Sequence, residues 1–203
     1  MDALCEHAEA ILSVALKYAG GGHNMAHAAM AGSRQFVELA HYPRHDVVDA
    51  GNRSRYFYHA HDSRRRPVDE HGHFHVFCHG RGRLDYFHLV GVSLNQRGLP
   101  TRLFTTNRWV TGERWRGGAE ITRRLDTFEI HARGRMAPVA RWITAMIHLY
   151  GLQIKSLVEQ RDALMAQRAQ SETWEHLFEN RQLDVVSQKR INLESRIRQL
   201  ACP

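Results

Sequence analysis

Two histidine-rich stretches decide the fold: Arg55–His61 (RYFYHAH) and His71–Phe77 (HGHFHVF). The first is rich in aromatic residues, and the second alternates strictly between histidine and other residues over its first six positions. Aromatic enrichment and a period of two are typical of β-strands. We therefore predict one strand in each stretch, joined by a polar loop over residues 62–70.

Two further strands complete the predicted sheet. Residues 85–95 are apolar on both faces, which is typical of a strand covered on both sides. Asn95 and Gly98 then occupy the first and last positions of a tight turn, and residues 99–110 run back as the fourth strand. The pattern predicts a four-stranded antiparallel meander over residues 53–112.

Helical periodicity flanks this sheet on both sides. Apolar residues over 3–18 follow helical spacing, and Asn24 is a suitable N-cap for a second helix that ends before Pro43. After the sheet we expect a short helix over 121–128. Pro138 is well placed as the first residue of a long helix.

The C-terminal part continues this helical pattern with one interruption. Residues 183–187 could be extended, and Asn192 could cap a last short helix. We expect a single α+β domain over residues 1–203, with the meander packed against N- and C-terminal helices. Its parts are 1–45 (helical), 53–112 (antiparallel sheet) and 118–203 (mainly helical).

The bulk composition indicates a globular protein without a membrane association. Hydrophobic residues make up 43% of the 203 residues, and no apolar run approaches the roughly 20 residues of a membrane span. The first residues lack the basic and apolar regions of a signal peptide. The three cysteines are far apart and odd in number, which fits a reducing compartment. We therefore expect a cytoplasmic protein.

Basic charge is concentrated after the third predicted strand. The net charge is +7, and residues 97–135 hold nine arginines against four acidic residues. A field of this sign favours anionic partners. Arg64 and Arg65, in the loop beside the histidines, could clamp a phosphate or carboxylate, although the same pattern fits a solvated basic loop.

Histidines gather on one face of the predicted sheet. The chain has fifteen, and seven of them lie within thirty residues: 59, 61, 71, 73, 75, 79 and 88. Residues two apart on a strand share a face. A hairpin closed symmetrically by the 62–70 loop places His59 opposite His73 and His61 opposite His71, with Cβ atoms about 4.5–5.5 Å apart.

Such a group of imidazoles suits one divalent transition metal ion, with zinc, iron, copper and nickel all compatible. The predicted metal ligands are His59, His61, His73 and His75, with His71 in reserve. The predicted ligand-binding residues around them are Glu70, Arg64, Arg65, Asn107 and Arg108. If the protein is an enzyme, this site favours metal-dependent hydrolase or oxygenase chemistry.

Three other interpretations stay open at this level. A metal-free polar pocket could use its histidines as acids, bases or hydrogen-bonding groups. A nucleic-acid-binding module could use the basic segment 97–135 with Trp109 and Trp115 as stacking groups. A metal-free interaction domain could instead present its C-terminal helices to a partner.

Four blocks of the sequence resemble an uncharacterised bacterial family that is classed only as a domain of unknown function. The resemblance rests on residues 58–61 (YHAH), 63–67 (SRRRP), 70–75 (EHGHFH) and 103–112 (LFTTNRWVTG). It covers most of the chain and implies a bacterial protein. It supplies no activity, cofactor or catalytic residue.

Overall fold

The protein is built on one six-stranded antiparallel sheet in which neighbours in the chain are neighbours in the sheet, in the order β1-β2-β3-β4-β5-β6. The computed structural model describes residues 2–33, 35, 37–61, 67–82 and 84–200. The strands are β1 (Tyr42–Asp49), β2 (Ser54–His59), β3 (Glu70–His79), β4 (Tyr86–Asn95), β5 (Pro100–Thr106) and β6 (Val185–Arg190).

The mixed α+β class is confirmed, but the sheet has six strands rather than four. The two additional strands, β1 and β6, lie at the edges: β1 was not predicted, and β6 was predicted only as a possible extended segment over residues 183–187. β1 contains Pro43, and β6 ends in exposed polar residues. Edge strands commonly carry proline and charged side chains because one side of their backbone stays unpaired. Their apolar patterns are therefore too weak to stand out in the sequence.

The helices are α1 (Asp2–Gly20), α2 (Met25–Ala29), α3 (Arg108–Thr111), α4 (Gly118–Asp126), η1 (Gly134–Met136), α5 (Ala137–Leu149), α6 (Gly151–Arg168), α7 (Trp174–Phe178) and α8 (Leu193–Leu200).

Several predicted boundaries are wrong. The second helix ends at Ala29, so residues 1–45 are not helical throughout. The predicted long helix from Pro138 is two helices, α5 and α6, and the fourth strand stops at Thr106 because Asn107 caps α3. Asn24 and Asn192 cap helices as predicted.

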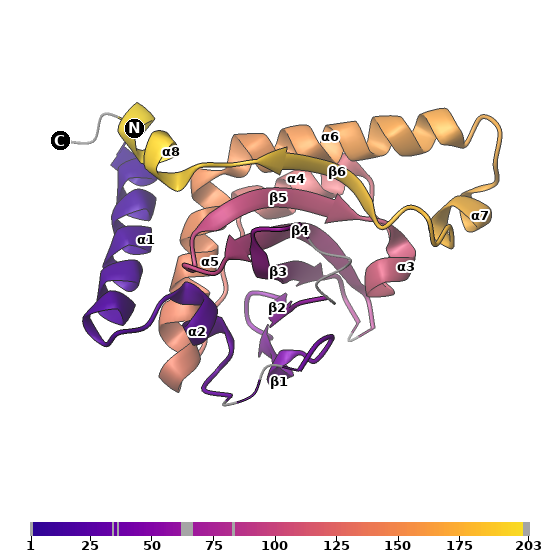
Figure 1. Cartoon of the computed structure of the whole chain (residues 1–203). Helices are drawn as coiled ribbons and strands as arrows, with labels where there is room; N and C mark the ends of the chain where they lie inside the picture. The colour runs from indigo at the N-terminus through magenta and orange to yellow at the C-terminus, as the bar shows by residue number, and fades with distance from the viewer. Residues whose placement is uncertain (1, 34, 36, 62–66, 83, 201–203) are drawn as a thin grey trace.

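One face of the sheet carries the main hydrophobic core. Figure 1 shows α4, α5 and α6 behind the sheet, with α1 and α8 beside one end. Tyr56, Phe74 and Val92 project from the strands into a cluster that includes Trp142 of α5 and Val158 of α6. Burial of this apolar surface is the main contribution to folding on this face.

The opposite face holds the histidines and a second set of aromatic side chains. His75 of β3 lies across Gly91 of β4, which lies across Phe104 of β5. A Cβ atom at Gly91 would stand 2.2 Å from the Phe104 ring. The missing side chain therefore lets Phe104 lie over β4 and reach His73 and His75, at ring-centroid distances of 5.2 and 5.7 Å.

The cysteines behave differently from one another. Cys5 on α1 is disulfide-bonded. Cys78 on β3 is a buried free thiol, and burial raises its pKa to about 11. Within the described residues, no helix combines the length and apolar character needed to cross a membrane.

Replacing Gly91 with alanine should lower the free energy of unfolding by about 1–3 kcal/mol, because the new methyl group overlaps the Phe104 ring. Urea unfolding of the two proteins measures this. Gly151→Ala is the matched control, since nothing lies within 4 Å of its added Cβ. A Phe104→Leu change should partly rescue Gly91→Ala; equal stability of Gly91→Ala and the parent protein would contradict the packing argument.

Candidate metal centre

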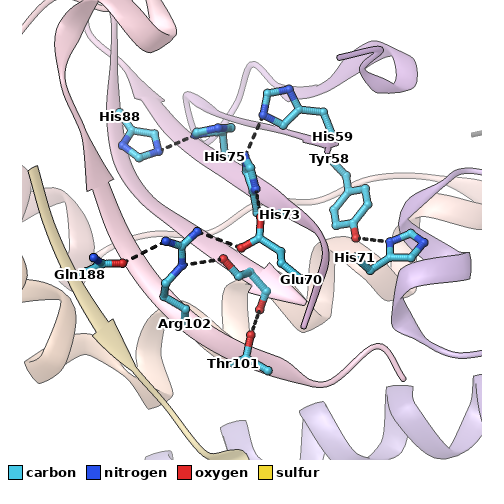
Figure 2. Close-up of polar contacts among 11 residues, drawn as sticks. Tyr58, His59, Glu70, His71, His73, His75, His88, Thr101, Arg102 and Gln188 are labelled. Carbon is cyan, nitrogen blue, oxygen red and sulfur yellow. Dashed lines mark hydrogen bonds and ion pairs between the residues drawn. The ribbon is translucent and has the colours of Figure 1, made fainter. Parts of the chain in front are cut away.

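Three buried histidines converge on the face of the sheet that lies opposite the main hydrophobic core. His59 of β2 pairs directly with His73 of β3, which confirms the predicted register at this point. His75 lies two residues further along β3 and projects to the same side. One ligand nitrogen from each ring lies within 4.8 Å of the other two. The Nε2 atoms of His59 and His73 are 2.8 Å apart. Figure 2 marks this contact with a dashed line.

Glu70 fixes the orientation of His73. Its Oε1 accepts a hydrogen bond from Nδ1 of His73 at 2.7 Å, while its Oε2 accepts one from Arg102 at 2.8 Å. Burial would raise the pKa of Glu70, but the hydrogen bonds from His73 and Ser93 and the positive charge of Arg102 bring it below its ordinary value. The carboxylate is therefore ionised, and Nε2 of His73 is directed to the centre.

His88 of β4 does the same for His75. Nε2 of His88 lies 3.0 Å from Nδ1 of His75, and Nδ1 of His88 lies 3.3 Å from the Thr106 hydroxyl. This leaves Nε2 of His75 for the centre. Sequence reasoning missed the role of His88, because it lies in a strand that is apolar on both faces. Only the pairing of His88 with Phe77 beyond a bulge in β3–β4 reveals its position.

Burial keeps the imidazoles of His59, His75 and His88 neutral. Desolvation, followed by the neighbouring rings of His73, His61 and His41, lowers the pKa of His59 to about 2. Desolvation is also the main cause that lowers the pKa of His75 far below its ordinary value and that of His88 to about 3. A neutral imidazole offers a nitrogen lone pair, which is the form that binds a metal ion.

His71 does not join the centre. The pairing of β3 with β4 shifts between Glu70 and Gly72, and this bulge changes the side to which residue 71 points. Nδ1 of His71 lies 2.7 Å from the hydroxyl oxygen of Tyr58, a residue of the main core. Glu70 occupies the place next to His73 instead.

His61 lies at the rim. Its half-buried ring stacks on His73 at 5.3 Å and meets His59 edge-on at 4.9 Å. It is therefore near the centre, although it is not one of the three residues whose nitrogens converge.

The structure does not bring Asn107 or Arg108, two of the predicted ligand-binding residues, to the centre. The side chain of Asn107 caps α3 and donates to the backbone oxygen of Leu177, and Arg108 pairs with Glu179 and lies over Phe178. Both are thus directed to α7 and the segment after it. Arg64 and Arg65 lie outside the described residues.

These features define an α+β protein with a buried three-histidine cluster, in which a carboxylate orients one ring and a fourth histidine orients another. The chain belongs to a family described as a domain of unknown function (DUF6969), whose model matches residues 5–191. Neither the curated proteins nor the solved structures contain a match to this chain.

The metal-free protein should lose stability as the pH falls from 8 to 5. His59, His75 and His88 have lower pKa values when folded than the ~6.5 of an unfolded chain, so the unfolded state binds more protons below pH 6.5. At pH 5 each buried imidazole should cost about 2 kcal/mol. Urea unfolding in the presence of a chelator measures this dependence.

His88→Gln should make this pH dependence shallower, because one of the three groups is removed. His45→Gln, at an exposed position of β1, is the control for the loss of a histidine. Equal stability of the parent protein at pH 8 and pH 5 would show that these rings are not held neutral.

Proposed function

We propose that this protein binds one divalent transition metal ion through His59, His73 and His75. The observation that carries the proposal is the convergence of three buried ring nitrogens within 4.8 Å. Two nitrogens bound tetrahedrally to one zinc ion at 2.0–2.1 Å lie ~3.3 Å apart. The 2.8 Å separation of the His59 and His73 Nε2 atoms therefore needs only a small outward movement to admit an ion.

The surroundings of the rings support the same assignment. Metal-bound histidines usually donate their other ring N–H to a carboxylate or another acceptor, which fixes the tautomer and the ring orientation. Glu70 is placed to accept the Nδ1–H of His73, and His88 is placed to accept the Nδ1–H of His75. Metal binding requires the Nε2 atoms of both His59 and His73 to be free of protons. Nδ1 of His73 then donates to Glu70, and His59 carries its proton on Nδ1.

Three protein ligands leave a coordination position for water or a small anion, as in catalytic zinc sites. A bound ion would supply Lewis acidity and lower the pKa of a bound water molecule. The walls formed by Phe57 and Phe104 exclude water from two sides, which strengthens electrostatic interactions with whatever occupies that position. A metal-dependent enzyme is the further proposal that this arrangement favours.

The nucleic-acid alternative is less well supported. Both tryptophans assigned to base stacking have a ring face covered by an arginine: Arg181 lies over Trp109 at 4.6 Å and Arg161 over Trp115 at 4.1 Å. The indole N–H of Trp109 also donates to the backbone oxygen of Leu183. Bases could stack on these rings only after displacing the internal partners.

The purified protein, dialysed against Zn²⁺ and analysed by elemental mass spectrometry, should retain one ion per chain. His73→Ala should abolish this stoichiometric binding, because it removes one of three ligands and the partner of Glu70. His45→Ala is the matched control, since His45 is exposed and is not one of the three converging histidines. Background metal in the parent protein, or undiminished metal in His73→Ala, would reject the proposal.

Glu70→Gln should weaken Zn²⁺ binding roughly 10–100-fold, because the amide orients His73 less well than a carboxylate does. Glu179→Gln is the control, since Glu179 also pairs with an arginine but lies directly after α7 and has no contact with the three converging histidines among those described. Competition with a chromogenic chelator measures both affinities. Identical affinities for the two variants would mean that the Glu70–His73 contact does not tune the site.

A further inference from the structure

An arginine-rich cavity lies at the other side of the sheet, beside the β3–β4 turn and α4. Its volume is about 420 Å³, and its lining includes Arg53, Arg81, Arg116, Arg123 and Arg124. Phe87 also lines it and belongs to the main core, whereas the next residue, His88, faces the histidine cluster. The cavity is therefore on the helical side of the sheet, separate from the cluster of His59, His73 and His75, although His79 at the end of β3 also lines it.

The charges of this cavity do not cancel. Its two carboxylates, Asp85 and Glu120, are both directed at Arg116. Among the described residues, no carboxylate forms an ion pair with any of the other four guanidinium groups: Arg53, Arg81, Arg123 and Arg124. Five positive charges thus meet two negative ones within a single hollow.

Arg124 gives the clearest sign of an absent partner. Its terminal nitrogen donates to the backbone oxygen of Asn52 at 3.0 Å, which holds the side chain in place. Its Nε atom is buried and has no hydrogen-bond partner within the described part of the chain. A buried donor without an acceptor is costly, so an oxyanion that accepts from Nε would be stabilised here.

We propose that this cavity binds a small molecule through a phosphate group. A phosphate carries up to two negative charges and several acceptor oxygens, which can satisfy more than one planar guanidinium at once. A single carboxylate has one negative charge and two oxygens, so it would leave most of the excess positive charge of the cavity uncompensated. The volume lies within the range of small-molecule sites, about 300–1,000 Å³, and the concave shape favours a compact ligand over a polymer.

The test is isothermal titration calorimetry on the full-length protein without added metal ion, with inorganic pyrophosphate as the probe and acetate as the carboxylate comparison. Pyrophosphate should bind at one site, more weakly as salt is added, and acetate should not. Arg124→Gln and Arg123→Gln should each weaken binding by about tenfold, because each removes a charge-assisted hydrogen bond.

Arg97→Gln is the matched control, because Arg97 is an exposed arginine at the β4–β5 turn and its loss should leave the affinity unchanged. Arg123 is also exposed, so Arg123→Gln decides the matter if Arg124→Gln does not fold. The proposal is overturned if pyrophosphate does not bind, or if Arg97→Gln and Arg123→Gln weaken binding equally. Binding of a single-stranded oligonucleotide but not of pyrophosphate would also overturn it, in favour of a nucleic-acid surface.

Discussion

The need to satisfy buried imidazole nitrogens is the constraint on which this structure depends. His59, His73, His75 and His88 are each less than 9% exposed, and a buried polar atom without a partner costs about 1–3 kcal/mol. The rings meet this requirement largely among themselves, through the contacts of His59 with His73 and of His75 with His88. The first contact joins β2 to β3 and the second joins β3 to β4, so these hydrogen bonds also hold the three strands in register.

These contacts extend outward into the polar edge of the sheet. Glu70 links His73 to Arg102 on β5, and Arg102 donates to Gln188 on β6 at 2.9 Å. Charge-assisted hydrogen bonds of this kind are stronger than neutral ones. The polar face is thus a continuous hydrogen-bonded network from β2 to β6. The apolar face, in contrast, is stabilised mainly by the non-directional burial of apolar surface. Rigid support of this type is what a preorganised binding site requires.

The structure also divides the arginines that make residues 97–135 basic. Arg102 and Arg108 pair with Glu70 and Glu179, so they serve the fold. Arg123 and Arg124 of α4 line the cavity, and no carboxylate in the described part of the chain forms an ion pair with either of them. Net charge along the sequence therefore pointed to anionic partners, but the sequence could not separate the arginines that are neutralised internally from those that are available.

The sequence alone determined the parts of the structure that depend on local periodicity. The alternation in residues 71–77 specified a strand with His73 and His75 on one face, and the length of the loop before it, residues 62–70, specified that His59 lies opposite His73. Helical spacing likewise located α1, α4 and the start of α5. These features follow from the geometry of single elements and of one hairpin, which a short stretch of chain encodes.

Only the tertiary structure decided the features that depend on contacts between distant strands. The bulge that turns His71 toward Tyr58 and leaves Glu70 beside His73 is set by the pairing of β3 with β4. The place of His88 depends on a second shift in the same pairing. Parity along a strand fixes faces only while the pairing is regular, and one inserted residue reverses it. The packing of the whole sheet, rather than any local pattern, therefore selected which histidines meet.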